Sequence, residues 1–360
     1  MASRFLLTIL SILLTACPRA TPPGSEEAVT HPRQELEVSF PGTDFELEGL
    51  LSLPAREEGT RVPALLLIHG SGPIDRDSTV SQSYPGLTPV EVRTFADLAE
   101  GLSDEGVAVL RYDKRSCGPW NGKCDNNYPE PNPSTNVSDF LADAGAALDF
   151  LSQQGEIDPE RVFALGHSQG AMLVPLLLAE RERLSGGLIA AGPHSPIYEL
   201  LRSQAKFQID FLVTQLGMTE GAAEAHLGSV LGLADEIEDL EDGDYQGSAL
   251  TAIEQAFWSD WLDTGARSIQ ALESLDRSLF AFSGSWDIQV PAEELTAWQT
   301  SFDASSAQPG HRTKLYECVT HNLNCVTGAD LLHLAQEDVT PNVFTEIIED
   351  ITGFIQDGGP

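Results

Sequence analysis

The stretch Gly166-His167-Ser168-Gln169-Gly170 lies between a strand-like run, residues 161–165, and a stretch with helical spacing, residues 171–180. A G-x-S-x-G motif at such a turn strains the backbone of its serine and exposes the serine hydroxyl. Glycine on both sides lets neighbouring segments approach the turn closely. The motif therefore predicts that Ser168 is a nucleophile. Its place at the start of a helix favours developing negative charge.

Strands and helices alternate along the chain on both sides of this turn. Residues 36–40 and 45–53 are predicted to form an antiparallel hairpin. The other predicted strands are residues 62–68, 107–112, 187–191, 279–283 and 312–318. The predicted helices are residues 95–102, 139–151 with Ser138 as N-cap, 293–298 and 343–355. This alternation implies an α/β fold with a mostly parallel central sheet flanked by helices.

Residues 197–275 interrupt the alternation, because they carry helical patterns over 198–216 and 222–240 and no strand pattern. They lie between two predicted strands of the sheet. We therefore expect them to form an inserted helical lid. Phe257, Trp258 and Trp261 within it are expected to pack the lid or, alternatively, to contact a substrate.

A second glycine-rich stretch, His69-Gly70-Ser71-Gly72-Pro73, follows the predicted strand 62–68. A loop at this place supplies a backbone N–H to the negative oxygen of a tetrahedral intermediate, and the residue after the nucleophile supplies the other. We expect the two oxyanion-hole donors to be the N–H groups of Ser71 and Gln169, with Gly72 as the alternative to Ser71. A plain glycine-rich turn is the rival interpretation.

The acid of a serine triad follows the nucleophile along the chain, and here Asp287 fits that order. Asp287 comes directly after the predicted strand 279–283, whereas Asp263 and Asp276 precede this strand. In so acidic a chain, a solvated surface carboxylate is the alternative. At the predicted position, Asp287 would hold the imidazole tautomer and stabilise the imidazolium.

The base of the triad is expected to be His321, which follows the predicted strand 312–318. His333, on an apparent helix, is the second candidate. A structural role is the ordinary one for a single histidine, but His321 has the order and place of a general base.

The N-terminus resembles a bacterial lipoprotein signal. Arg4 precedes an apolar run over residues 5–14, which is too short to span a bilayer. The run ends in Leu14-Thr15-Ala16-Cys17, so residues 1–16 are predicted to be cleaved and Cys17 to be lipidated. The resemblance implies export and, because Pro18 follows, outer-membrane anchoring. Ordinary signal cleavage before an incidental cysteine is the alternative. Residues 17–34 are predicted to be a flexible tether.

The remaining four cysteines are expected to form disulfides, because an even number is typical of exported proteins. The expected connectivity is local, since the members of each pair are equally spaced: Cys117 with Cys124, and Cys318 with Cys325. A zinc site is the rival, but it favours closer thiolate pairs. The pair Cys318–Cys325 would brace the loop that carries His321.

The charge balance excludes some partners. The chain has 55 acidic and 20 basic residues, a formal net charge of −35, which disfavours contact with nucleic acid. No P-loop, dinucleotide fingerprint or metal motif is present in the sequence. We therefore expect no cofactor and no metal, and a small molecule as the substrate.

Several motifs together resemble a bacterial branch of the α/β hydrolases, described as esterases or serine-aminopeptidase-like hydrolases. The motifs are His69-Gly70-Ser71-Gly72-Pro73, Asp75-Arg76-Asp77, Arg111-Tyr112-Asp113-Lys114-Arg115, Gly166-His167-Ser168-Gln169-Gly170, Gly284 with Asp287, Val290-Pro291 and His321. The resemblance implies an α/β-hydrolase fold, with core segments at 35–196 and 276–360. It also implies carboxylic ester hydrolysis by Ser168, Asp287 and His321. Residues Asp75-Arg76-Asp77 are expected to line the pocket mouth or to form a local ion-pair network.

Three functions remain open at this point. The first is a carboxylesterase that cleaves a small or medium ester through an acyl-enzyme. The second is a peptidase or amidase that uses the same triad. The third is a catalytically silent surface protein that uses the fold for binding.

Overall fold

The computed structural model describes residues 29–44, 46–82, 90–117, 124, 135–306, 310–326 and 339–357. The predicted signal segment, Cys17 and His333 lie outside these residues. The predicted tether does not extend to residue 34, because β1 (Thr30–His31) pairs with β4 (Arg56–Glu57) and β2 begins at Gln34.

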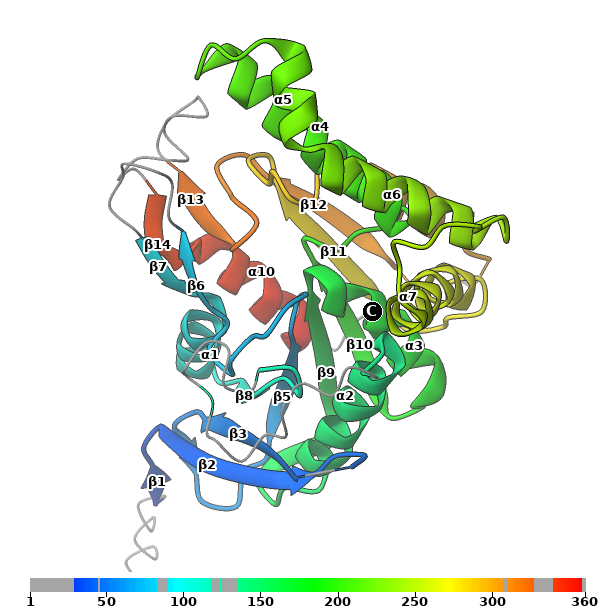
Figure 1. The fold of residues 1–360 in the computed structure, drawn as a ribbon. Helices are drawn as coiled ribbons and strands as arrows, with labels where there is room; N and C mark the ends of the chain where they lie inside the picture. Colours follow the sequence, from blue (N-terminus) through cyan, green and yellow to red (C-terminus); the bar gives the residue numbers. More distant parts are fainter. Residues whose placement is uncertain are drawn as a thin grey trace, which may run out of the picture.

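An eight-stranded mixed sheet forms the centre of the molecule (Figure 1). Six neighbouring strands are parallel to one another. At one edge, the next strand is antiparallel to these six and to the edge strand beside it. In order across the sheet the strands are β12 (Arg312–Tyr316), β11 (Leu279–Gly284), β10 (Leu184–Ala190), β9 (Ile157–His167), β5 (Val62–Ile68), β8 (Ala108–Tyr112), β3 (Glu46–Leu53) and β2 (Gln34–Pro41). The predicted α/β architecture is therefore present.

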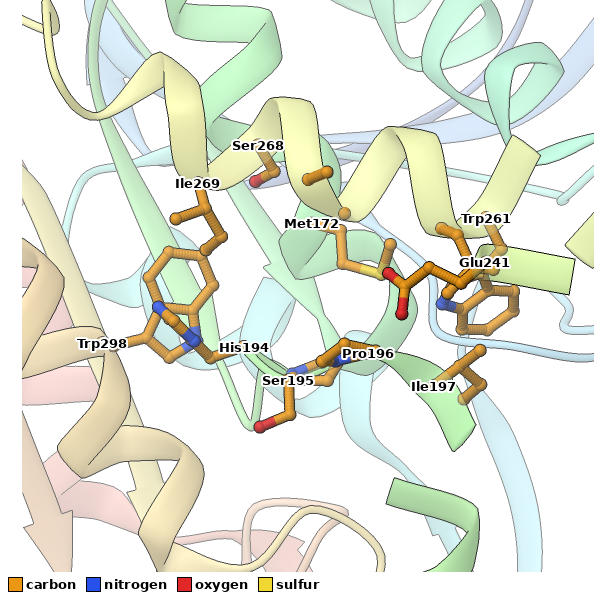
Figure 2. A pocket seen from close by; sticks show the side chains of 14 residues that line it. Met172, His194, Ser195, Pro196, Ile197, Glu241, Trp261, Ser268, Ile269 and Trp298 are labelled. Carbon is orange, nitrogen blue, oxygen red and sulfur yellow. The ribbon is translucent and has the colours of Figure 1, made fainter. Parts of the chain in front are cut away.

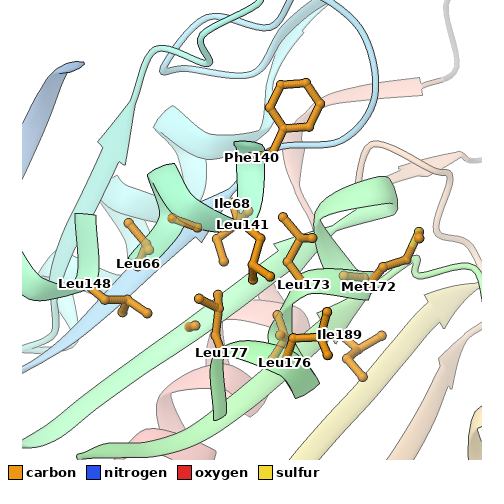
Figure 3. Close-up of a cluster of buried hydrophobic side chains, with 14 of the residues drawn as sticks. Leu66, Ile68, Phe140, Leu141, Leu148, Met172, Leu173, Leu176, Leu177 and Ile189 are labelled. Atoms are coloured by element: carbon orange, nitrogen blue, oxygen red, sulfur yellow. The ribbon is translucent and has the colours of Figure 1, made fainter. Parts of the chain in front are cut away.

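Helices cover both faces of this sheet, as the apolar strand sequences require. They are α1 (Thr94–Asp104) and α10 (Thr345–Gln356) on one face, and α2 (Val137–Ser152), α3 (Leu173–Glu180) and α8 (Ala292–Ala304) on the other. Residues of β5 alternate between the two cores: Leu65 and Leu67 face the first, whereas Leu66 and Ile68 face the second. Figure 3 shows Leu66 and Ile68 in the cluster with α2 and α3.

Four helices follow β10 and precede β11, and residues 197–275 contain no strand. They are α4 (Ile197–Thr214), α5 (Glu220–His226), α6 (Gly228–Glu241) and α7 (Ala252–Ala271). Helix α4 packs along α6, and α7 packs on α2 and α3 (Figure 1). These helices thus contact the core next to the turn that carries Ser168.

Some predicted element limits were wrong. The helix predicted over 222–240 is broken at Leu227 into α5 and α6. Helix α2 begins after Asn136 rather than Ser138, since the Asp139 carboxylate accepts a hydrogen bond from the Asn136 N–H. The last strand of the sheet ends at Tyr316, before the predicted limit of 318.

Two small hairpins lie outside the main sheet. They are β6 (Thr79–Gln82) with β7 (Val90–Arg93), and β13 (Asn324–Val326) with β14 (Val339–Val343). Strand β14 includes Val343, so the last helix begins two residues later than predicted. The helix η2 (Ser168–Met172) joins β9 to α3. None of the helices within the described residues combines the length and apolarity needed to cross a bilayer.

Candidate active site

Ser168 lies at the turn from β9 into η2, and its backbone has φ of +54°. This left-handed conformation is strained for a residue with a side chain. The flanking glycines allow it, because a Cβ on Gly166 would overlap the carbonyl of Gly170, and a Cβ on Gly170 would overlap the end of β5. The sequence therefore folds into a tight turn that leaves the Ser168 side chain half-buried at the carboxyl edge of the sheet.

Asp287 and His321 form a buried pair at the same edge of the sheet. Asp287 Oδ2 lies 2.8 Å from His321 Nδ1, and the Asp287 side chain is fully buried. The other carboxylate oxygen accepts hydrogen bonds from the N–H groups of Gln289 (2.9 Å) and Val290 (2.7 Å). These contacts fix the carboxylate, so the His321 Nδ1–H donates to it and Nε2 carries the lone pair.

The loop that carries His321 is braced from several sides. Cys318 and Cys325 close it with a disulfide, and the Thr94 hydroxyl donates to the carbonyl of Asn322 (3.1 Å). His167, the residue before Ser168, donates from Nε2 to the carbonyl of His321 (2.7 Å). The centroids of the His167 and His321 rings are 4.8 Å apart. The residue next to Ser168 thus contacts the residue that we predicted to be its base.

The Ser168 hydroxyl and the His321 ring are not joined by a hydrogen bond within the described residues. Catalytic hydrogen bonds are often long in structures without substrate and shorten in the complex. The hydrogen bond from His167 to the His321 carbonyl joins the turn after β9 to the loop after β12.

The predicted oxyanion loop lies against Ser168. A Cβ on Gly70 would come within 3.0 Å of the Ser168 Cβ, so the absence of a side chain lets the loop approach. In the described part of the chain, neither Ser71 nor Gln169 uses its N–H for a hydrogen bond. Both residues line a cavity of about 390 Å³, whose apolar wall includes Phe140, Phe257 and Trp261. We name this cavity the oxyanion-side pocket.

A second cavity of about 290 Å³ is also lined by Trp261 (Figure 2). Its wall includes Met172, which ends η2, and Trp298 of α8. The Glu241 carboxylate also lines it and accepts a hydrogen bond from the Tyr198 hydroxyl (2.7 Å). Trp261 thus lines two cavities that both touch the helix η2, which begins at Ser168.

Arg76 and Asp77 take part in ion pairs, and Asp75 holds the following turn. Arg76 pairs with Asp113 (2.5 Å), and Asp77 pairs with Arg111 (2.9 Å). Asp75 accepts a hydrogen bond from the N–H of Thr79 (2.8 Å). The ion pairs of Arg76 and Asp77 fit the network interpretation, and all three residues also line a polar cavity with Asp113.

The segment after β8 is fixed by a disulfide between Cys117 and Cys124, so both cysteine pairs are the local ones. Next to it, Arg115 forms a bidentate contact with the buried Asp143. The turn after Arg115 is therefore held by a disulfide on one side and by an ion pair on the other.

Sequence reasoning missed two groups near the site. It treated His167 as a motif residue, although this side chain holds the His321 loop and burial lowers its pKa to about 4. It gave no role to Lys114, whose amine is buried beside Gly70 and Gln169. The position of His167 inside the G-x-S-x-G motif was a usable signal. Lys114 stood in the quoted motif 111–115, but its role could not be inferred there, because its partners lie in the loop after β5 and the turn after β9.

Residues 65–327 match the family model described as the alpha/beta hydrolase family. Among curated proteins, the chain is similar to esterase EstD of Thermotoga maritima, with 35% identity over 170 residues. These residues are 47% of this chain and 36% of that esterase. The alignment thus spans little more than a third of that relative's length.

Solved structures include similar folds. Est1E from Butyrivibrio proteoclasticus has a TM-score of 0.52 at 16% identity, covering 89% of this chain and 98% of that chain. The Pyrococcus furiosus esterase PF2001 has a TM-score of 0.51 at 14% identity, covering 91% and 92%. At these identities the likeness concerns the fold alone.

Proposed function

Because the chain belongs to the alpha/beta hydrolase family, we propose that it is a serine hydrolase that cleaves a carboxylic ester through an acyl-enzyme. The esterase relative supports an ester hydrolase in general terms. The nucleophile, the triad and the substrate class are part of the proposal.

The observation that carries the proposal is the buried hydrogen bond between Asp287 and His321, 2.8 Å long, at the sheet edge where Ser168 has a strained backbone. A positive φ is uncommon for a residue with a side chain, and a buried carboxylate has no need of a histidine. Their coincidence at one edge supports a nucleophile with a base and an orienting acid.

In the proposed reaction, Ser168 Oγ attacks the ester carbonyl carbon while His321 Nε2 accepts the hydroxyl proton. The tetrahedral intermediate places its oxygen between the N–H groups of Ser71 and Gln169. His321 then donates the proton to the departing alkoxide, which leaves as the alcohol. Water, deprotonated by His321, attacks the acyl-enzyme, and His321 then returns the proton to Ser168 Oγ as the bond to the acyl carbon breaks and the carboxylic acid leaves.

The size of the oxyanion-side pocket supports a small or medium acyl group. Its volume of about 390 Å³ is near the lower end of ligand pockets, and its aromatic wall favours an apolar group. Trp261 lines both this pocket and the second cavity.

We expect the purified protein to hydrolyse p-nitrophenyl butyrate faster than the matched p-nitroanilide, because an ester has the better leaving group. A fluorophosphonate probe should bind covalently to the folded protein, since it reacts with activated serines. The turnover rate measures the ester hydrolysis, and mass spectrometry measures the covalent labelling by the probe. A folded protein that neither reacts with the probe nor hydrolyses the ester would be a binding protein instead.

A peptidase or amidase acting with the same triad is the second candidate. Glu241 favours it, because a carboxylate in a cavity next to the site could bind the amino terminus of a peptide. The anilide measured beside the ester separates the two functions, since a peptidase would hydrolyse an aminoacyl anilide at a rate comparable to that of the ester.

We also propose that the protein is exported and anchored in the outer membrane through a lipid on Cys17. The lipobox-like sequence supports this proposal, and the two disulfides fit an oxidising compartment. In a bacterial host fed with radiolabelled palmitate, we expect the wild type to carry label and the Cys17→Ser variant to carry none. Label on the Cys17→Ser variant would contradict the assignment.

A further inference from the structure

Lys114 follows β8 and extends its side chain toward the predicted oxyanion loop. The residue is only 4% exposed, and its Nζ lies 4.0 Å from the centre of the Phe140 ring. The amine donates to the carbonyl of Gly70 (2.6 Å) and to the side-chain oxygen of Gln169 (2.9 Å). One amine thus joins the loop after β5 to the turn after β9.

The identity of these two acceptors is informative. The Gly70 carbonyl and the Ser71 N–H belong to the same planar peptide group. A cationic donor at the carbonyl fixes the orientation of this group and polarises it, so the N–H becomes a stronger donor. Gln169, the other acceptor, is the residue whose main-chain N–H is the second predicted oxyanion donor.

The charge environment of Lys114 is unusual for a structural lysine. Within the described residues no carboxylate lies within ion-pair distance of its Nζ, although buried lysines are otherwise paired. Burial lowers the pKa of the Lys114 amine to about 7. The neighbouring His69 stays neutral, because burial, and then the charge of Lys114, lower its pKa to about 3.

We propose that Lys114 is a positioning residue of the oxyanion hole, which orients and polarises the Ser71 N–H through the Gly70 carbonyl and holds Gln169 in place through its side chain. The inference rests on the proposed esterase function and deepens it. An oxyanion that forms near these donors gains a nearby positive charge when the amine is protonated. A neutral amine keeps both hydrogen bonds, because it still has two N–H groups, but it loses the charge.

The test uses Lys114→Met, which keeps the length of the side chain and removes both hydrogen bonds and the charge. Loss of a direct oxyanion donor lowers kcat by about 10²–10³-fold, so loss of its positioning residue should lower kcat about 10–100-fold. We expect KM for p-nitrophenyl butyrate to change little, because the lost interaction acts on the transition state. Lys314→Met is the matched control, since Lys314 also donates to two side chains, Glu346 and Asp350, on a different face.

A second readout separates positioning from a merely structural role. A trifluoromethyl ketone forms a tetrahedral oxyanion on an activated serine, whereas the matching methyl ketone binds without one. In Lys114→Met, the inhibition constant of the trifluoromethyl ketone should rise by the factor by which kcat/KM falls, and that of the methyl ketone should stay unchanged. Equal weakening of both ketones would mean that Lys114 only maintains the shape of the pocket.

Lys114→Gln is measured alongside, in case the methionine variant does not fold. It retains a donor without a charge, so an intermediate loss of kcat is expected. Wild-type kcat in either variant, with a wild-type melting temperature, would overturn the role of Lys114 and leave the esterase proposal intact. Failure of the proposed function itself would be visible in the wild type, as absence of ester hydrolysis and of probe labelling.

Discussion

Alanine in place of Ser168 is expected to lower kcat for p-nitrophenyl butyrate by roughly 10⁴–10⁶-fold, the scale seen when a triad nucleophile is removed. The reason is that no hydroxyl remains to form the acyl-enzyme. The residual rate would come from the N–H groups of Ser71 and Gln169 acting on a water molecule. Steady-state kinetics and fluorophosphonate labelling measure the effect, and labelling should disappear altogether.

The matched control for this variant is Ser185→Ala. Ser185 lies near the start of β10, at the opposite end from the carboxyl edge, and its hydroxyl donates to the carbonyl of Glu160. The control should retain wild-type kcat and labelling. If Ser168→Ala retained its label, another residue would be the nucleophile, and the proposed triad would be wrong.

The central sheet was predictable because its strands are buried on both faces. Continuous apolar runs such as residues 62–68 are typical of such strands, and the glycine-flanked Ser168 shows where one of them turns into a helix. Asp287 and His321 could then be selected from chain order and from their places after strands. These signals lie in short stretches of the sequence, so they can be recognised without knowledge of the tertiary structure.

Features that depend on distant partners were missed or misplaced. Strand β14 is defined by its pairing with β13, and its last residue, Val343, was included in the predicted last helix. The helix break at Leu227 coincides with Gly228, which costs little to place at the start of a new helix. Lys114 has partners in the loop after β5 and in η2, so its role could be seen only after these segments were brought together.

The hydrogen bonds of Asp287 imply that Asp287→Asn lowers kcat by about 10⁴-fold, the effect of this change on the acid of a serine triad. The N–H groups of Gln289 and Val290 both point at Oδ1, so they require an oxygen at that position. The NH₂ of the asparagine is therefore turned toward His321 Nδ1. Since a donor then faces Nδ1, this nitrogen must accept, and the imidazole proton moves to Nε2, which can no longer take the proton of Ser168.

Kinetics of Asp287→Asn, measured with the melting temperature, separates this tautomer effect from unfolding. Asp276→Asn is the matched control, because the Asp276 side chain is exposed before β11 and should be neutral for kcat. A folded Asp287→Asn variant with kcat within about tenfold of the wild type would mean that His321 is not held by Asp287 as general base. With a 10⁴-fold loss and an unchanged melting temperature, the carboxylate acts through the histidine, since a bond that served only the fold would lower stability as well.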